Sequence, residues 1–404
     1  MGDGEVGTCG GSFLRINILV NAPWGNTAYS NMAKLFGPRV QALGHDVSMT
    51  AMWGLEGGTV EWGKIPVFPK HADKLSRDIA APHANHWGAD VFFSWCDAFV
   101  VEPRTFQDLP WSPWLPVDAD PVSPHLVPLL KHARWPLVYS QWGLERLQDA
   151  GVEHARYVPV GVDSATFRQL DRSEARRQMG LSDDTFVVGM VAANLHGDRK
   201  AYPQQLRAFS EFKRKHSDAI LVIHALKGHQ LGGVDLMAVC KSLGLVAGED
   251  VLFSNQYAYN AGQYGTDSMA ILYNAFDVLL ACTQAEGFGI PIVEAALCGV
   301  PAIVGDWSSM GELNFADLAH PEEDANRIWN NFDTFWWLPH HTVIAELLEE
   351  AYYTDWTTRR RDLRLAAIQY DAGNVVANYW QPLLEEMQQE LGIQYTADFQ
   401  AVLI

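Results

Sequence analysis

The sequence predicts an α/β protein composed of two Rossmann-like domains that face each other. Its 404 residues are enough for two or three hydrophobic cores, and 48% hydrophobic with 19% charged residues is typical of a globular chain. Two successive series of short apolar strands alternate with helical segments, which indicates parallel sheets covered on both faces. A turn-rich segment, residues 161–167, separates the two series. We therefore expect one parallel-sheet domain on each side of that segment.

The first series follows a glycine-rich leader. Residues 1–12 contain five glycines and no apolar period, so we expect them to be flexible. Residues 15–21 predict a first strand, and apolar residues at helical spacing from Tyr29 to Leu43 predict a helix that ends at Gly44. Further strands are predicted at residues 47–52, 91–94, 114–117, 137–139 and 157–160. These elements define a predicted first domain, residues 13–165.

The second series begins with a charged helix at residues 173–179. Its strands are predicted at residues 186–190, 219–224, 251–253, 278–281 and 301–304, with helices between them. These elements define a predicted second domain, residues 166–374. The tail is helical in pattern from Val375 to Leu391, and we expect the C-terminal segment, residues 375–404, to pack against the first domain.

The net charge indicates which binding partners to expect, and the cysteines and the N-terminal residues indicate the cellular compartment. The formal net charge of −19 repels nucleic acids and anionic membranes, so long nucleic acid is not an expected partner. A local cationic pocket can still hold a phosphate, because contacts within a few Å outweigh distant screened charges. The five cysteines lack Cys-x-x-Cys spacing, the first residues do not resemble a signal peptide, and no apolar run is long enough to span a membrane. We therefore expect a cytoplasmic protein.

The segment Thr283-Gln-Ala-Glu-Gly-Phe-Gly-Ile-Pro-Ile-Val-Glu294 carries the most specific pattern in the chain. It follows a predicted strand, its glycines allow close backbone approach, and Pro291 suits the first turn of a helix. The helix N-terminus therefore presents N–H groups to an anion. Glu286 and Glu294, with seven residues between them, would repel a phosphate but can accept hydrogen bonds from sugar or ribose hydroxyls.

This segment, continued by Glu294-Ala-Ala-x-x-Gly-x-Pro301, resembles the donor-binding motif of retaining, nucleotide-sugar-dependent glycosyltransferases with the GT-B fold, especially family 4. Two other segments agree with the resemblance. Residues 158–163 resemble the interdomain segment of that family, and Arg199-Lys200 follows a strand where the family has its basic diphosphate clamp. The resemblance implies a GT-B architecture with an interdomain cleft, an acceptor-binding first domain and a donor-binding second domain.

The resemblance also implies roles for individual residues. Glu286 would hold the sugar hydroxyls, Glu294 the ribose, and Arg199 and Lys200 the diphosphate. Gly25 resembles the glycine through which the first domain approaches the phosphate. The implied donor-binding set is Gly25, Arg199, Lys200, Glu286, Gly287, Phe288, Gly289, Ile290 and Glu294. The family uses no metal or other cofactor, because cations and a helix dipole neutralise the leaving diphosphate. In that family the acceptor attacks the sugar from the same face that the diphosphate leaves.

The chain departs from the family pattern on the acceptor side. Trp24-Gly25-Asn26 replaces a glycine pair, Lys200-Ala201 replaces a lysine followed by glycine, and the usual histidine after a first-domain strand is absent. Asp118 or Asp120 would take the place of that histidine, so the implied catalytic residues are Glu286, Asp118, Arg199 and Lys200. Asp118-Ala-Asp120 also matches a Mn²⁺-binding Asp-x-Asp pattern, and a purely structural role in capping the loop stays open.

The expected function is metal-independent transfer of a hexose from a nucleotide diphosphate sugar to a hydroxyl acceptor. The acceptor could be a glycan, a lipid, a small molecule or a protein. One alternative is a catalytically silent sugar- or nucleotide-binding protein with the same fold. Another is a GT-B epimerase or phosphorylase.

Overall fold

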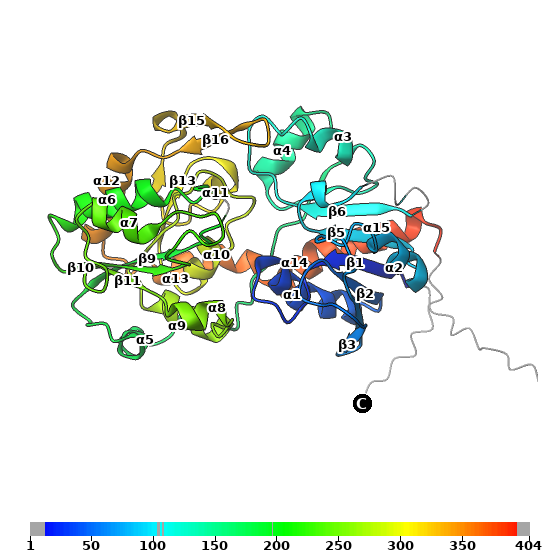
Figure 1. Cartoon of the computed structure of the whole chain (residues 1–404), viewed down its shortest axis with the longest axis horizontal. Helices are drawn as coiled ribbons and strands as arrows, with labels where there is room; N and C mark the ends of the chain where they lie inside the picture. Colours follow the sequence, from blue (N-terminus) through cyan, green and yellow to red (C-terminus); the bar gives the residue numbers. More distant parts are fainter. Residues whose placement is uncertain (1–12, 103–105, 107–108, 196, 394–404) are drawn as a thin grey trace, which may run out of the picture.

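The computed structural model of the chain describes residues 13–102, 106, 109–195 and 197–393. The predicted leader, residues 1–12, and residues 394–404 of the predicted C-terminal segment lie outside the described residues. Two α/β units stand side by side, and the chain crosses between them (Figure 1). We call residues 13–160 the first unit and residues 168–370 the second unit. The predicted fold class of two facing Rossmann-like domains is confirmed.

The first unit is built on one sheet, in which most strands are parallel. Its order within the described residues is β3-β4-β2-β1-β5-β6-β7-β8, and only β3 runs antiparallel to its neighbour there. The strands are β1 (Arg15–Val20), β2 (Asp46–Ala51), β3 (Val60–Trp62), β4 (Ile65–Phe68), β5 (Val91–Trp95), β6 (Trp111–Leu115), β7 (Leu137–Val138) and β8 (Arg156–Tyr157). The helical segments are α1 (Ala28–Ala42), α2 (Ala80–Trp87), η1 (Ala98–Val100), α3 (Leu126–Leu130) and α4 (Gln141–Asp149).

The second unit has a parallel sheet of the order β11-β10-β9-β12-β13-β14. Its strands are β9 (Phe186–Val191), β10 (Ala219–His224), β11 (Val251–Phe253), β12 (Val278–Leu280), β13 (Ala302–Gly305) and β14 (Ala319–His320). The helical segments are α5 (Arg172–Met179), α6 (Tyr202–Lys213), α7 (Leu236–Ser242), α8 (Gln256–Asn260), α9 (Thr266–Asn274), α10 (Ile290–Leu297), α11 (Ser308–Glu312), η3 (Glu322–Asp324), α12 (His341–Tyr353), α13 (Arg360–Ala367) and η4 (Ile368–Tyr370). An antiparallel hairpin, β15 (Asn326–Trp329) with β16 (Phe335–Leu338), extends from this unit.

The chain crosses between the units twice, and the two crossings lie against each other. The amide of Val162 donates to the carbonyl of Tyr370 (2.8 Å), and the amide of Ala372 donates back to the carbonyl of Val162 (2.9 Å). After the second crossing the chain forms α14 (Ala372–Val375), the π-helical segment η5 (Val376–Trp380) and α15 (Gln381–Glu390). Trp380 is fully buried and packs edge-on against Trp114 of β6, with 4.9 Å between ring centroids. The C-terminal helices therefore belong to the core of the first unit.

Several strands differ from those that the sequence predicts. Strand β6 begins at Trp111 rather than Trp114, because Ser112 satisfies its hydroxyl inside the sheet by donating to the carbonyl of Trp135 (2.7 Å). Strand β8 is Arg156–Tyr157 rather than residues 157–160, since the Val158 carbonyl accepts a hydrogen bond from the Trp114 indole instead of a strand. The sequence patterns gave no sign of β3, β4, β14 or the β15–β16 hairpin.

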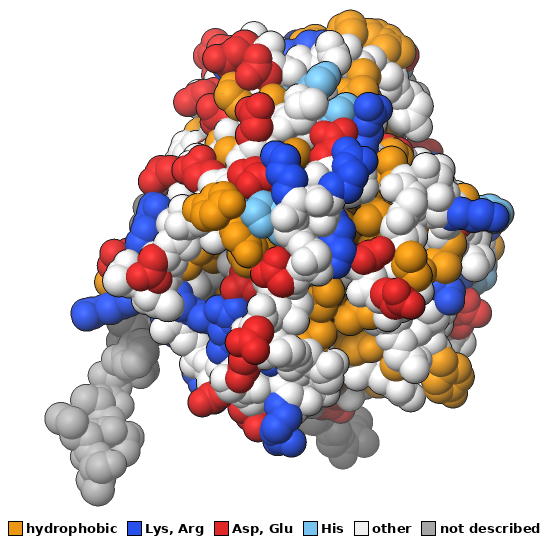
Figure 2. All heavy atoms as spheres, turned by 90° about the vertical axis from the view of Figure 1, so that its left-hand side faces the viewer, with side chains coloured by type: hydrophobic (Ala, Val, Ile, Leu, Met, Phe, Trp, Pro, Cys, Tyr) orange, Lys and Arg blue, Asp and Glu red, His pale blue; other side chains and the backbone are white. Residues whose placement is uncertain are grey.

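The outer face of the second unit carries acidic and basic side chains interspersed with one another (Figure 2). No helix within the described ranges combines the length and the apolar character needed to cross a membrane.

Candidate active site

A glycine-containing loop joins β12 to α10 where the two units meet. Gly289 precedes α10 with a φ of 102°, in the left-handed region that favours glycine. Gly287 has no room for a side chain, because a Cβ there would lie 2.1 Å from the Cβ of Pro116 in the first unit. Gly289 therefore turns the chain into the helix, and Gly287 lets the first unit approach the loop.

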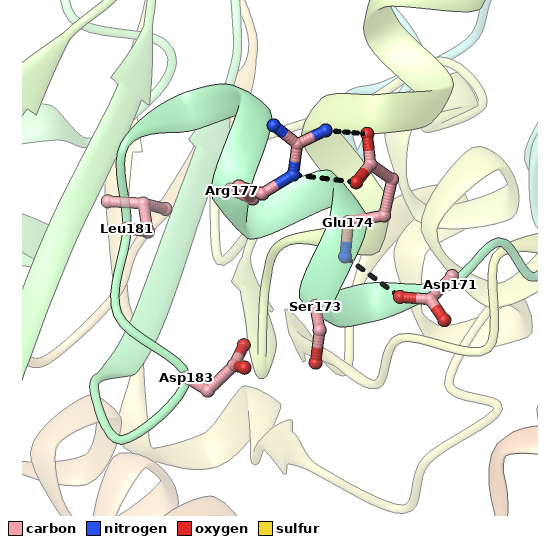
Figure 3. Close-up of a pocket in the computed structure, with 6 residues that line it drawn as sticks. All are labelled: Asp171, Ser173, Glu174, Arg177, Leu181 and Asp183. Carbon is pink, nitrogen blue, oxygen red and sulfur yellow. Dashed lines mark hydrogen bonds and ion pairs between the residues drawn. The ribbon is translucent and has the colours of Figure 1, made fainter.

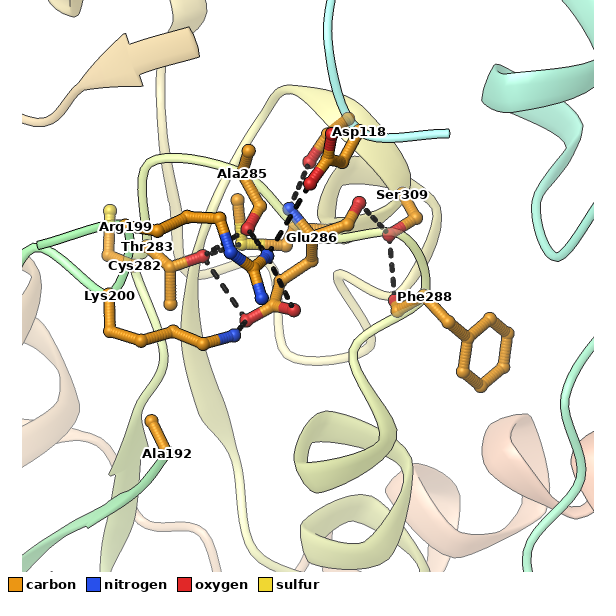
Figure 4. A network of polar contacts seen from close by, with 12 residues as sticks. Asp118, Ala192, Arg199, Lys200, Cys282, Thr283, Ala285, Glu286, Phe288 and Ser309 are labelled. Carbon is orange, nitrogen blue, oxygen red and sulfur yellow. Dashed lines mark hydrogen bonds and ion pairs between the residues drawn. The ribbon is translucent and has the colours of Figure 1, made fainter. Parts of the chain in front are cut away.

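The carboxylate of Glu286 in this loop is held by two cations of the same unit (Figure 4). Lys200 donates to Oε1, and Nη1 of Arg199 lies 3.6 Å from Oε2. The Thr283 hydroxyl lies 3.4 Å from Oε1. Burial alone raises the pKa of Glu286, but Lys200 and Arg199 outweigh burial and hold that pKa below its ordinary value. Glu286 is therefore ionised at neutral pH.

Arg199 and Lys200 lie in the loop between β9 and α6. Burial lowers the pKa of Lys200, the neighbouring charge of Arg199 lowers it further, and Glu286 opposes both effects. The next residue, Ala201, has a φ of 49°, in the left-handed region where glycine is the usual residue. The steric strain of an alanine in that conformation costs the folded state roughly 1–2 kcal/mol. The loop thus forms the turn that presents the two cations although alanine, rather than glycine, stands at its end.

Asp118 reaches the same cluster from the first unit, in the loop after β6. Its Oδ2 lies 3.5 Å from Nη1 of Arg199, and the Trp336 indole donates to Oδ1 at 3.4 Å. Burial raises the pKa of Asp118, and the charge of Arg199 opposes that rise. The structure thus brings together all four residues predicted to be catalytic, which point toward one another in Figure 4: Asp118, Arg199, Lys200 and Glu286.

Asp97 is a further carboxylate of this cluster, and sequence reasoning missed it. The Tyr29 hydroxyl donates to its Oδ2 at 2.9 Å. Burial raises the pKa of Asp97, while the hydrogen bond from Tyr29 and the charge of Arg199 lower it. Asp97 follows β5, which pairs with β6 in parallel, so the ends of both strands meet at one edge of the sheet. That adjacency is the signal that could have placed Asp97 beside Asp118.

Asp120 does not join this cluster. Its Oδ2 lies 3.5 Å from Nη1 of Arg327 on the hairpin, and its amide donates to the carbonyl of Phe335 at 3.3 Å. Asp118 and Asp120 therefore have different partners and do not converge as an Asp-x-Asp pair. Within the described part of the chain, no three His, Cys, Asp or Glu side chains gather as a metal site.

Glu294 lies one turn into α10, apart from the Glu286 cluster. The Tyr273 hydroxyl donates to its Oε2 at 2.6 Å. Burial raises the pKa of Glu294 to about 7, although the hydrogen bond from Tyr273 opposes this rise. The side chain lines a cavity of about 630 Å³ between the two units, which is also lined by Asn31 and Lys34 of α1 and by Tyr264 of the second unit. A cavity of this volume is in the range of small-molecule sites.

Gly25 lies in the loop between β1 and α1, beside that cavity. Its amide donates to the carbonyl of Ala22 (3.0 Å), and its carbonyl accepts a hydrogen bond from Lys34 (2.8 Å). The next residue, Asn26, lines the cavity and donates its side-chain amide to the carbonyl of Gly262 in the second unit, at 2.7 Å. The loop is thus at the interface, but the Gly25 amide already has a partner inside the loop.

Phe288 and Ile290 complete the predicted donor-binding set. The Phe288 ring is buried and packs edge-on against Tyr370, with 5.4 Å between centroids, so its side chain serves the core. The Ser309 hydroxyl donates to the carbonyls of both Glu286 and Phe288, at 2.8 Å each, and fixes the loop. Ile290 lines the 630 Å³ cavity beside Glu294.

Helix α11 connects this loop to the first unit. Ser309 lies near its start, and at its end the Glu312 carboxylate accepts hydrogen bonds from the amides of Gln141 (3.1 Å) and Trp142 at the N-terminus of α4. Burial raises the pKa of Glu312, and these two amides lower it. A carboxylate at a helix N-terminus stabilises the helix dipole. The second unit therefore caps a helix of the first unit close to the candidate site.

A second hollow, of about 470 Å³, lies over α5 (Figure 3). Its polar groups bond to one another: Asp171 accepts from the amide of Glu174 (2.8 Å), and Arg177 donates to the Glu174 carboxylate. These pairs are the ordinary N-terminal cap and an i,i+3 ion pair of an exposed helix, so this hollow is not a candidate active site.

Comparisons with known proteins match part of the second unit by sequence and the overall fold by structure. Residues 171–315 match the family model described as "Glycosyl transferases group 1". A D-inositol 3-phosphate glycosyltransferase from Rhodococcus erythropolis is 30% identical over 172 residues, which are 42% of this chain and 36% of that protein. The matched part thus spans about a third of the relative's own length.

Solved structures share the whole architecture. Sucrose-phosphate synthase from Thermosynechococcus elongatus aligns with a TM-score of 0.69 at 15% identity, over 93% of this chain and 98% of that one. HepE from Anabaena, solved in complex with UDP, aligns with a TM-score of 0.65 at 16% identity, over 92% of this chain and 100% of that one. This chain has the GT-B fold.

Proposed function

We propose that this chain is a retaining glycosyltransferase of the family 4 type, which moves a sugar from a nucleoside diphosphate sugar to an acceptor hydroxyl. The observation that carries the proposal is the pair Arg199 and Lys200, held beside Glu286 next to the N-terminus of α10. Two cations and a helix dipole can stabilise the negative charge that develops on a leaving diphosphate. We therefore propose that the reaction needs neither a metal nor another cofactor.

In the proposed complex the two glutamates divide the donor between them. Glu286 accepts hydrogen bonds from the sugar hydroxyls, beside the cations that hold the diphosphate. Glu294 accepts hydrogen bonds from the ribose in the 630 Å³ cavity. An ionised carboxylate is an acceptor only, so both residues suit neutral hydroxyl donors. The backbone from Gly287 to Ile290 and the loop around Gly25 border the same donor site.

The proposed reaction is an attack from the face that the diphosphate leaves. The acceptor oxygen bonds to the anomeric carbon as the bond from that carbon to the phosphate oxygen breaks, and the electron pair leaves with the diphosphate. The departing phosphate takes the acceptor's proton. Asp118 lies on the first-unit side of Arg199, where its carboxylate could orient the acceptor hydroxyl or stabilise positive charge on the sugar carbon.

The comparisons support the donor class more than the acceptor. The family match, residues 171–315, includes Arg199, Lys200, Glu286 and Glu294, whereas Asp118 lies outside it. The relative from Rhodococcus erythropolis is named a glycosyltransferase, and HepE from Anabaena was solved with UDP.

A panel of nucleotide sugars and bare nucleotides tests the proposal by two readouts on the same protein. A ligand at 100 times its dissociation constant stabilises the folded state by about 2.7 kcal/mol, which a thermal-shift assay detects. The second readout is free nucleoside diphosphate, which is released as the sugar passes to water when no acceptor alcohol is supplied. We expect at least one donor both to stabilise the protein and to release its diphosphate. If nucleotides stabilise the protein but no donor releases its diphosphate, the proposal that the chain is an enzyme is overturned, and the chain is a nucleotide-binding protein.

A further inference from the structure

A separate cavity, of about 310 Å³, opens beside Asp97 and Asp118. It lies between the first unit and the β15–β16 hairpin, and its volume is at the lower end of the range for ligand pockets. Pro116, which contacts Gly287, also lines it, so the cavity adjoins the loop that carries Glu286. Its position is on the first-unit side of the proposed reaction centre, away from the 630 Å³ cavity that Glu294 lines.

Two aromatic rings from different units form part of its wall. Phe99 follows β5 in η1, Phe332 belongs to the hairpin, and their ring centroids lie 6.1 Å apart with 31° between the ring planes. The exposed fractions are 50% for Phe99 and 41% for Phe332, so both rings offer free surface. Five further lining residues are aliphatic: Leu115, Val117, Val122, Leu126 and Leu129. Such a wall suits a ligand with an apolar ring.

The hairpin is bonded in place over the cavity. The Ser123 hydroxyl donates to the carbonyl of Phe332 at 2.7 Å, and His125 Nε2 lies 2.7 Å from the Asp333 carboxylate. Figure 1 shows the hairpin at the top of the second unit, reaching toward α3 and α4 of the first. Because these bonds are made by Phe332 itself and by the next residue, the position of the ring at the cavity is set by contacts between the units.

The charged groups at the cavity are unsuited to an anion. Asp97 and Asp118 both line it, and a phosphate placed near them would meet two carboxyl groups. The described lining residues include no Lys or Arg, and His125 is engaged by Asp333. The cavity therefore favours a neutral ligand that offers hydroxyl donors to carboxylates.

We infer that this cavity is the acceptor subsite and that the acceptor is an uncharged alcohol or phenol carrying an apolar ring. The inference rests on the proposed function, because the cavity becomes an acceptor site only if the neighbouring loop binds a sugar donor. The ring lies against Phe99 and Phe332, and the hydroxyl lies at Asp118. Its oxygen then forms the new bond to the anomeric carbon, and its proton leaves with the diphosphate. Such an acceptor differs from the phosphorylated compounds in the names of the relatives.

The first test measures binding alone, by saturation-transfer NMR on the full chain with UDP present. The probes are 2-phenylethanol and glucose 6-phosphate. We expect 2-phenylethanol to bind, and the variant Phe332→Ala to weaken it by about tenfold, the usual size of one lost aromatic contact. Trp329→Ala is the matched control, because Trp329 is 61% exposed on the same hairpin and packs on Phe335 rather than lining the cavity. The control is expected to bind within about twofold of the parent.

The second test measures turnover with whichever donor releases its diphosphate in the panel. We expect 2-phenylethanol to yield a glycoside, and Phe332→Ala to raise its KM while the KM for the donor is unchanged. Preference for glucose 6-phosphate, failure of 2-phenylethanol to bind, or equal effects of the two variants would overturn the inference. The proposed function fails separately, if no nucleotide sugar binds or reacts, and the NMR measurement still reports on the cavity in that case.

Discussion

The guanidinium of Arg199, in the second unit, lies 3.5 Å from the carboxylate of Asp118, in the first. The same nitrogen, Nη1, lies 3.6 Å from Glu286 and donates to the carbonyl of Ala285 at 2.6 Å. One cation therefore links the glycine loop of one unit to the acidic strand ends of the other. This arrangement exists only when the units are together.

Replacing Arg199 by alanine is expected to lower turnover about 10²- to 10³-fold. A preorganised donor to developing negative charge is commonly worth about 3–4 kcal/mol. Steady-state kinetics with the identified donor measures the loss. Arg207→Ala is the matched control, because Arg207 follows in α6, is exposed, and pairs only loosely with Glu211 at 3.5 Å. A parent-like rate for Arg199→Ala would remove this residue from the proposed mechanism.

Asp118→Asn keeps the size of the side chain and removes its charge. We expect a large drop in turnover, with donor affinity and melting temperature nearly unchanged. The neighbouring Asp120→Asn is the control, since Asp120 faces Arg327 on the hairpin and not Arg199. If Asp118→Asn turns over normally, or loses activity only by melting early, its carboxylate has no part in the reaction.

Nucleotide affinity is expected to depend on the ionisation of Glu294. Its pKa is about 7 in the free protein, and the proposed ribose contact needs the ionised carboxylate. Affinity should therefore be full above pH 7 and fall by up to about tenfold per pH unit below it. Isothermal titration of UDP between pH 5.5 and pH 8.5 measures this slope. Glu294→Gln should bind more weakly at high pH and show a flatter profile, whereas a slope that persists in Glu294→Gln would place the titrating group elsewhere.

The same carboxyl is expected to reduce the stability of the unliganded protein at high pH. Because its pKa is raised in the folded state from 4.5 to about 7, the folded protein binds more protons than the unfolded chain between these values. Stability therefore falls as pH rises through that window. Above it, Glu294→Gln should be the more stable protein by up to about 3 kcal/mol, and near pH 4 the two should differ little. Denaturant unfolding at pH 4 and pH 8 measures the difference; an equal difference at both pH values would refute it.

The sequence predicts the donor half of the site more completely than the acceptor half. Strand, glycine, proline and glutamate stand in one continuous segment from Thr283 to Glu294, so local patterns were enough to predict a loop at a helix N-terminus. Arg199 and Lys200 were recognisable because they follow a strand. Their contacts with Glu286 in the structure come from β9 and β12 lying side by side in the sheet.

The acceptor half depends on contacts that no local pattern contains. Asp97 and Asp118 are 21 residues apart in the chain and meet because β5 pairs with β6. Asp120, two residues from Asp118, takes a hairpin arginine as its partner. Phe332 reaches the 310 Å³ cavity from the other unit, on a hairpin whose strands the apolar spacing did not reveal. Spacing along the sequence cannot report such pairings, because they depend on the order of strands and on the packing of the units.

The most direct measurement is nucleoside diphosphate release from a panel of nucleotide sugars in the presence of chelator, with the parent and Glu286→Gln compared. We expect the parent to release the diphosphate of at least one donor without added metal, because Arg199 and Lys200 supply the positive charge. Glu286→Gln should lose most of that release while it still binds the bare nucleotide. Release by the parent only after Mn²⁺ is restored, or undiminished release by Glu286→Gln, would contradict the account.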